Sequence, residues 1–250
     1  MPTYVCYLPR DKFSPDQKRQ IVDAITRMSD SRRRPSSLPR VTHGAFGIFR
    51  HYVKCRFVDT PPSLWAALAL QYGDRTFKLK LNRADISVAG RRDGQTIAAA
   101  LQSPPTRSAP IDPLLQADLL QLLGYSIDDL DLKIPPAKIH GGTDHVVLAL
   151  KNRDALARMN YDFERGRELM ELAGLITIAL VTAENPQLFH VRNAFAAGSV
   201  LEDPATGAAA AAFAGYSRDM RWPHAGVINI VQGEDMGMRS LIRARLRAVQ

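Results

Sequence analysis

Two adjacent acids precede a proline in the segment 202–207, which reads Glu-Asp-Pro-Ala-Thr-Gly. Asp favours the N-cap of a helix and Pro its first position, so the sequence predicts a helix capped by Asp203. A helix N-terminus binds anions through its unpaired N–H groups and partial positive charge. We therefore expect a proton-transfer site in which Asp203 exchanges a proton while the amides of Gly207 and Ala208 hold a carboxylate or enolate oxygen. The alternative is that Asp203 serves only as the helix cap.

The helix predicted at 203–217 has no polar face, because residues 208–216 are almost all small and apolar. A helix of this kind must be surrounded on all sides. The neighbouring sequence is rich in strands, so we expect antiparallel strands to sheathe the helix, with 227–231 and 242–248 among them. Arg243, Arg245 and Arg247 alternate with apolar residues in the last strand, which predicts that the arginines face solvent.

The other segments predict an α+β chain. A strand at 3–8 is followed by a helix at 15–28, whose start carries the capping residues Ser14 and Gln17 around Pro15. Further helices are expected at 63–71, 114–123 and 162–172, with a loop at 104–113. Further strands are expected at 77–81, 85–89, 96–101, 146–150, 176–181 and 187–191.

The composition indicates a globular protein with no cofactor. A chain of 250 residues with 46% hydrophobic residues can bury one large core or two smaller ones. It has no run of about 18 apolar residues and no secretory signal, which predicts a cytoplasmic protein without a membrane span. Its two cysteines and six scattered histidines fit neither a disulfide framework nor a zinc site, so we expect no metal. No glycine-rich nucleotide loop occurs.

The net charge of +8 is concentrated in two stretches. Residues 31–58 contain seven basic residues and no acidic one, and a second cluster comprises Arg239, Arg243, Arg245 and Arg247. Such charge can attract nucleic acid or an anionic substrate, but a solvated or irregular segment is the favoured interpretation. Aromatic residues at 46, 49 and 52 could stack on bases, yet they match no nucleic-acid module. Nucleic-acid binding is therefore only a minor alternative.

The segment 202–207 and the small residues after it resemble the signature of the phenazine-biosynthesis isomerase (PhzF-like) family, which shares the diaminopimelate-epimerase fold. The likeness extends upstream to the run Arg-Asn-Ala-Phe at 192–195 and downstream to 222–233. It also includes the Gly-Gly-Thr-Asp-His-Val turn at 141–146. In all, the resemblance covers about residues 63–250.

The resemblance implies two lobes, each an antiparallel β-barrel wrapped round a central helix, with the active site between them. It implies cofactor-independent isomerisation or epimerisation of a small carboxylate metabolite, often in a homodimer. The family's signature aspartate corresponds to Asp203, and its anion-holding amides to Gly207 and Ala208. The remaining residues expected to bind substrate are Glu202, Thr206, Gly142 and His145.

The sequence departs from the family pattern at three points. Ala208 stands where relatives commonly carry Ser or Asn, so one hydrogen-bonding side chain is absent. The first lobe's catalytic Glu and Gly-His-Ala-Thr motif have no match before the helix at 63–71, and the chain stops at Gln250, where a further strand is expected. We therefore expect an incomplete first lobe (62–135) and a second lobe (136–250). A non-catalytic relative that binds a small acid or a partner protein is the alternative.

The N-terminus has a resemblance of its own. The runs Pro-Thr-Tyr-Val-Cys-Tyr at 2–7 and Phe-Ser-Pro-Asp-Gln-Lys at 13–18 look like the opening strand and helix of the tautomerase superfamily, particularly its dehalogenase-like branch. This implies that Pro2, once Met1 is removed, could act as an acid or base, since α-amines titrate at about 7.7–8.0. The likeness fades after about residue 28. We therefore expect a tautomerase-like unit (1–30) and a basic irregular linker (31–61), with Pro2 as the alternative catalytic residue.

Overall fold

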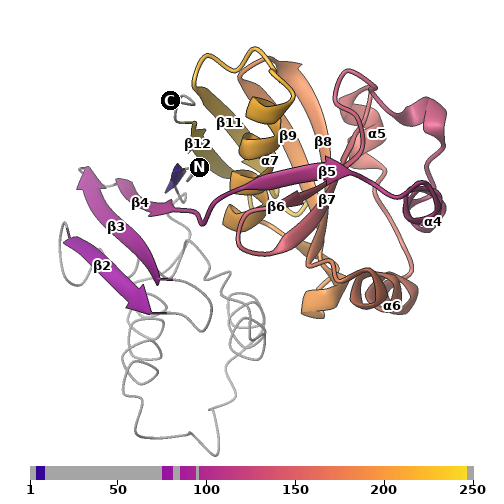
Figure 1. The fold of residues 1–250 in the computed structure, drawn as a ribbon, viewed down its shortest axis with the longest axis horizontal. Helices are drawn as coiled ribbons and strands as arrows, with labels where there is room; N and C mark the ends of the chain where they lie inside the picture. Colours follow the sequence, from indigo (N-terminus) through magenta and orange to yellow (C-terminus); the bar gives the residue numbers. More distant parts are fainter. Residues whose placement is uncertain (1–3, 9–74, 81–84, 94–95, 247–250) are drawn as a thin grey trace, which may run out of the picture.

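The computed structural model describes residues 4–8, 75–80, 85–93 and 96–246 (Figure 1). Within these ranges the strands form one mixed sheet in the order β2-β3-β4-β1-β12-β11-β9-β8-β7-β6-β5, and β10 pairs with β9 off this path. The helices predicted at 15–28 and 63–71 and the linker predicted at 31–61 lie outside the described residues, as does Pro2.

The strands of the first half are β1 (Tyr4–Leu8), β2 (Arg75–Lys80), β3 (Asp85–Asp93), β4 (Thr96–Gln102), β5 (Arg107–Pro110) and β6 (Ala137–His140). Those of the second half are β7 (Asp144–Ala149), β8 (Thr177–Asn185), β9 (Leu188–Ala194), β10 (Glu202–Asp203), β11 (Val227–Gln232) and β12 (Ser240–Arg245). The helices are α4 (Pro113–Leu123), α5 (Arg153–Ala157), α6 (Phe163–Ala173) and α7 (Gly207–Asp219), with 3-10 turns η1 (Ile127–Asp129) and η2 (Ala196–Gly198).

Helix α7 is the centre of the larger core. Residues 209–217 of this helix are buried, and the sheet curls so that β5, β6 and β7 on one side and β12 and β1 on the other all contact it (Figure 1). The small side chains of α7 permit close packing: a Cβ added to Gly141, in the turn after β6, would lie 2.7 Å from the carbonyl oxygen of Ala208. The predicted α+β fold with a sheathed central helix is confirmed.

The prediction of purely antiparallel strands around this helix is wrong. β7 pairs with β8 in parallel, and so does β9 with β11. Parallel neighbours need a crossover connection, usually helical. α5 and α6 lie between β7 and β8 in the chain, and α7 lies between β9 and β11. Helices α6 and α7, both of which the sequence predicts, therefore lie in the two crossover connections, whereas α5 was not predicted.

A second core covers the opposite face of the sheet. Helices α4, α5 and α6 contribute Leu119, Leu156 and Met170, which pack with Val146 and Leu148 of β7. The next residues along β7, Val147 and Ala149, face α7 instead. A strand that is buried on both faces reads as a continuous apolar run, which explains the sequence at 146–150.

The segment 104–113, predicted to be a loop, contains strand β5 at the edge of the sheet. An edge strand tolerates proline, because one side of it makes no ladder hydrogen bonds. β5 pairs with β6, and both contact α7. β5, which the predicted boundaries assign to a first lobe, therefore packs with the elements around α7. The positions of the lobe boundaries stay predictions.

The predicted N-terminal strand is part of the same sheet. β1 lies antiparallel to both β4 and β12, with Tyr4 opposite Gln102 on one side and Arg245 on the other. β2, β3 and β4 form an antiparallel ladder beyond it. In β12, Arg243 and Arg245 are exposed as predicted. None of the helices in the described ranges is long and apolar enough to cross a membrane.

Candidate functional site

Asp203 does not cap α7, so the prediction of a helix that begins at this residue is wrong. It ends the short strand β10, opposite Asn193 of β9, and α7 begins four residues later at Gly207 with Thr206 as the N-cap residue. The Asp203 side chain turns back on its own segment: Oδ1 accepts from the amide of Ala205 (3.3 Å) and Oδ2 from the hydroxyl of Thr206 (2.8 Å). Pairing with β9 holds Asp203 in a strand, so the helix starts only after the intervening turn.

Gln232, at the end of β11, joins the two ends of this turn. Its Nε2 donates to the carbonyl oxygen of Asp203 (2.6 Å) and to Oγ1 of Thr206 (3.0 Å), and its Oε1 accepts from the amide of Thr206 (3.2 Å). Asp203, Thr206 and Gln232 are 4%, 0% and 1% exposed. Sequence reasoning did not single out Gln232, although a lone amide that ends an apolar strand was a usable signal.

The turn is also held at Pro204. The hydroxyl of Ser240 on β12 donates to the Pro204 carbonyl (2.8 Å) and to that of Gln232 (3.3 Å). Gly233 has a φ of +76°, and a Cβ at this position would lie 2.5 Å from the carbonyl oxygen of Met238 and 2.9 Å from that of Pro204. Only glycine fits both the conformation and the space.

The first turn of α7 offers two amides to a ligand. The amide of Thr206 donates to Gln232, and that of Ala210 donates to the Thr206 carbonyl (3.0 Å). For the amides of Gly207 and Ala208, the described part of the chain supplies no acceptor. Ala208 is partly exposed, so an anion could approach this turn and gain from the helix dipole.

Glu202 has a different environment from its neighbour. Its carboxylate pairs with Arg192 of β9, at 2.6 Å between Oε2 and Nη2, and its side chain is only 4% exposed. Successive residues of a strand point to opposite sides, so Glu202 and Asp203 reach different partners. The structure thus gives Glu202 a partner within the protein, and its predicted contact with substrate stays untested.

The predicted residues of the turn at 141–146 divide into two groups. Gly141 packs against the first turn of α7, and Gly142 has a φ of +106°, which favours glycine. His145 is completely buried, with Nε2 2.9 Å from Oγ1 of Thr143 and Nδ1 2.8 Å from Oγ1 of Thr177. Burial lowers the pKa of His145 to about 3, so the ring is neutral at physiological pH. It is enclosed by the two threonines and presents no surface to a ligand.

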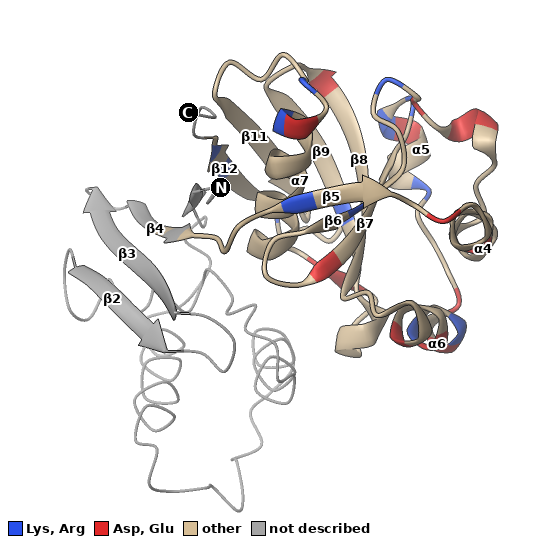
Figure 2. Cartoon of the chain, in the orientation of Figure 1, with Lys and Arg blue, Asp and Glu red and all other residues tan. Residues whose placement is uncertain are grey.

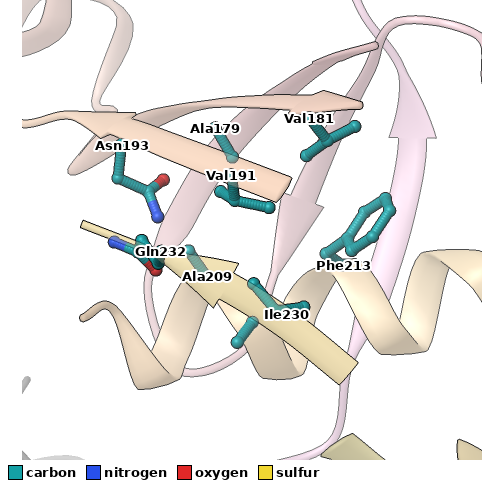
Figure 3. A pocket seen from close by; sticks show the side chains of 9 residues that line it. Ala179, Val181, Val191, Asn193, Ala209, Phe213, Ile230 and Gln232 are labelled. Atoms are coloured by element: carbon teal, nitrogen blue, oxygen red, sulfur yellow. The ribbon is translucent and has the colours of Figure 1, made fainter. Parts of the chain in front are cut away.

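A small cavity lies between the first turns of α7 and the sheet (Figure 3). It is lined by Ala179, Val181, Val191, Asn193, Ala209, Ala210, Phe213, Ile230 and Gln232. The two carboxamides lie at one end and the apolar side chains at the other (Figure 3). Asn193 is 1% exposed, and within the described ranges its Oδ1 has no hydrogen-bond partner. The cavity volume is about 10 Å³, which is room for about one water molecule.

Many of the other charged groups in the described ranges form ion pairs or hydrogen bonds. Acidic and basic residues are interspersed along α6 (Figure 2), where Arg167 lies 2.7 Å from Glu164. In the C-terminal basic cluster, Arg239 donates to Glu234 (3.0 Å) and Arg243 to the side chain of Asn229 (3.0 Å). The described residues contain no group of three His, Cys, Asp or Glu side chains placed to hold a metal ion.

Comparison with known proteins identifies relatives for most of the chain. The family model for phenazine biosynthesis-like proteins (PhzC-PhzF) matches residues 64–250. A curated protein of Mesorhizobium japonicum, described as an uncharacterized isomerase, is 31% identical over 194 residues, which make up 72% of this chain and 63% of that protein. The chain thus spans less than two thirds of the length of this relative.

Two solved structures share the fold. A PhzF-family phenazine biosynthesis protein of Bacillus anthracis superposes with a TM-score of 0.59 at 16% identity, over 74% of this chain and 71% of that one. A predicted epimerase of Pseudomonas aeruginosa gives 0.58 at 20% identity, over 75% and 70%. At such identities these likenesses establish the fold alone, and they agree with the epimerase-type architecture expected from the sequence.

Proposed function

This chain belongs to the phenazine biosynthesis-like (PhzC-PhzF) family, and from that premise we propose that it is an isomerase that moves a proton on a small carboxylate metabolite. Asp203 exchanges the proton, and the amides of Gly207 and Ala208 hold the anionic oxygen. The curated relative described as an isomerase supports the reaction class. The substrate contacts are inferred from the residues of the site.

One observation carries the proposal: a buried carboxylate lies next to an open helix N-terminus. Asp203 is bonded directly to Thr206, the residue that precedes the two amides, so base and anion-binding groups occupy one turn. Removal of a proton next to a carboxyl or carbonyl group develops negative charge on the oxygen. A base on one side and preorganised N–H donors on the other meet both requirements of that step.

In the proposed step, Asp203 takes a proton from a carbon adjacent to the substrate's carbonyl group. The C–H bond breaks, an O–H bond forms on Asp203, and the electron pair moves onto the carbonyl oxygen as an enolate. The amides of Gly207 and Ala208 donate to that oxygen. Return of the proton to another carbon completes an isomerisation, and no oxidant or reductant is consumed.

A non-catalytic relative that binds a small acid is the second candidate. Two features of the sequence favour it: the missing Glu and Gly-His-Ala-Thr elements before residue 63, and Ala208 in place of a hydrogen-bonding residue. The same two amides would then bind the acid without any proton transfer. A third candidate places the chemistry on Pro2, which lies outside the described residues.

Proton–deuterium exchange in D2O, followed by NMR on a panel of small cyclic and keto acids, tests the proposal. We expect exchange in the wild type and a fall of at least about 100-fold in Asp203→Asn, in line with loss of a general base. Asp219→Asn is the matched control, because Asp219 lies at the opposite end of α7 and bonds to Ser108. It should exchange at the wild-type rate.

The outcomes separate the three candidates. Unchanged exchange in Asp203→Asn would exclude the role of this residue, and loss only in Pro2→Ala would move the chemistry to the N-terminus. Saturable binding of an acid with no exchange would support the binding protein. We also propose a homodimer, as the family resemblance implies, and sedimentation velocity on the purified chain tests it.

A further inference from the structure

With Asp203 ionised, the hydrogen bonds among Asp203, Thr206 and Gln232 admit one arrangement of protons. The amide of Thr206 can only donate, so the oxygen of the Gln232 carboxamide must be the atom that accepts from it (3.2 Å). The other end of the carboxamide is then the NH2 group, which donates to the Asp203 carbonyl and to Oγ1 of Thr206. The backbone therefore fixes the orientation of Gln232.

The direction of the Thr206 hydroxyl follows. A threonine hydroxyl has one proton, and its oxygen already accepts from Gln232. Its proton therefore lies toward Oδ2 of Asp203, 2.8 Å away. With the amide of Ala205 on Oδ1, each oxygen of the Asp203 carboxylate accepts a hydrogen bond.

Thr206 occupies the N-cap position of α7, but its side chain does not cap the helix. Threonine at an N-cap normally accepts a hydrogen bond from an amide of the first helical turn. Here Thr206 makes no such bond, and its hydroxyl turns back to Asp203 instead. The consequence is twofold: the first-turn amides are left uncapped, and the carboxylate gains a donor. A threonine that only capped the helix would bond to a first-turn amide and would give Asp203 no donor.

We propose that Thr206 and Gln232 are positioning residues that hold Asp203 as a proton acceptor, with its carboxylate fixed beside the N-terminus of α7. Hydrogen bonds to the charged form of a carboxyl group favour that form and offset the effect of burial. A fixed carboxylate also avoids reorientation during the reaction. The assignment of Asp203 as a base in the reaction rests on the function proposed above, whereas the proton arrangement does not.

Two acidic side chains near the cluster are paired with arginines. Glu202 of β10 pairs with Arg192, and Asp235, beyond β11, lies 2.8 Å from Arg153. Among the described residues, the side chains of Gln232 and Ser240, which do not titrate, reach the turn from neighbouring strands. A variant of Thr206 or Gln232 thus changes the hydrogen bonds to Asp203 and leaves these charges in place.

The test measures the Asp203 carboxyl directly, in the ligand-free full chain. Aspartate labelled with 13C at the carboxyl carbon gives a 13Cγ signal that is assigned by its loss in Asp203→Asn. In Thr206→Val we expect the titration midpoint of this signal to move to higher pH by about one unit or more, because a charged acceptor loses a donor. Thr206→Ser keeps the hydroxyl and should restore the wild-type midpoint.

Thr182→Val is the matched control for burying valine in place of threonine. Thr182 is also buried, and its hydroxyl donates to the Leu150 carbonyl (2.8 Å), so its loss should not move the Asp203 signal. Gln232→Met is the second variant, in case Thr206→Val does not fold. It removes the donor that orients Thr206 and should move the midpoint in the same direction.

Exchange kinetics give the second readout. Thr206→Val should lower kcat at pH 7 by about tenfold or more while KM stays within about twofold, and Thr206→Ser should recover most of the rate. An unchanged midpoint in the folded variants Thr206→Val and Gln232→Met would overturn the proposal. If the wild type exchanges no compound, the proposed function fails, but the titration still decides the proton arrangement.

Discussion

Arg192 and Glu202 form an ion pair that is almost completely buried, with side chains 11% and 4% exposed and 2.6 Å between Nη2 and Oε2. Nη1 of Arg192 also donates to the carbonyls of Ala157 (2.9 Å), the last residue of α5, and Met159 (3.3 Å), just beyond it. Burial lowers the pKa of Arg192, but hydrogen bonds and charge from Glu202 outweigh it, so the net pKa is raised. The pair ties β10, and with it Asp203, to β9 and to the end of α5.

Removing this guanidinium should be strongly destabilising. Arg192→Met leaves the Glu202 carboxylate buried without its partner, and we expect the free energy of unfolding to fall by about 3–5 kcal/mol. Arg167→Met removes the exposed pair with Glu164 and should change it by at most about 1 kcal/mol. Urea unfolding followed by circular dichroism compares the two variants. Equal losses in both variants would show that the buried pair contributes no more to stability than the exposed one.

His145 should make the fold sensitive to acid. Its pKa is about 3 in the folded chain because burial disfavours the charged ring, against 6.5 for an unperturbed histidine. Between these values the unfolded chain binds more protons than the folded one, so stability falls as the pH drops below about 6.5. The slope from this residue is at most about 1.4 kcal/mol per pH unit.

Two measurements check the behaviour of His145. Urea unfolding at a series of pH values should show a shallower decline below pH 6.5 in His145→Gln than in the wild type, since glutamine takes up no proton. In the NMR spectrum of the wild type, the ring signals of His145 should not titrate between pH 8 and 4.5. A ring that titrates near 6.5 would contradict its enclosure by Thr143 and Thr177.

The central helix could be predicted from the sequence because its composition permits only one environment. A run of alanines with no polar face must be enclosed, whatever the details of the surrounding strands. The capping of α4 and α6 is equally local: Asp112 and Asp162 accept from first-turn amides, and Gly124 and Gly174 end the helices in the left-handed conformation. Such features depend on neighbours in the chain.

What the sequence did not predict depends on distant partners. Asp203 looks like an N-cap until β10 pairs with β9, which places it in a strand and passes the cap position to Thr206. β5 is only four residues long and ends in a proline, so its strand character comes from pairing with β6. Gln232 gains its role from two residues that lie 26 and 29 positions away.

Gly141 should be required for the position of the first turn of α7. A Cβ at this position would lie 2.7 Å from the carbonyl oxygen of Ala208 and 2.9 Å from the amide nitrogen of Ala212. Because these are backbone atoms, Gly141→Ala must displace the helix, and we expect a loss of about 1–3 kcal/mol. Exchange at the site should also fall by about tenfold or more, since Ala208 moves with the helix.

Gly124→Ala is the control for Gly141→Ala. Gly124 has a φ of +69° and nothing within 4 Å of an added Cβ, so the substitution introduces backbone strain of about 1–2 kcal/mol without a clash. It lies at the end of α4, away from the turn that carries Asp203, and exchange should be unchanged. Thermal unfolding and the exchange assay on both variants separate stability from activity. Equal exchange in the two would show that the contact with Ala208 does not matter.

Replacing the buried Asn193 by an apolar residue should cost little stability. Its Oδ1 is buried beside the small cavity and has no hydrogen-bond partner within the described ranges, so the folded state does not recover the free energy of its desolvation. Asn193→Val removes that carbonyl, and we expect the free energy of unfolding to stay within about 1 kcal/mol of the wild type or to rise. Thr182→Val, which breaks a satisfied buried hydrogen bond on the same sheet, should lose about 1–3 kcal/mol. Urea unfolding of both variants decides the matter: a larger loss in Asn193→Val than in Thr182→Val would mean that a bound water or ligand satisfies Oδ1.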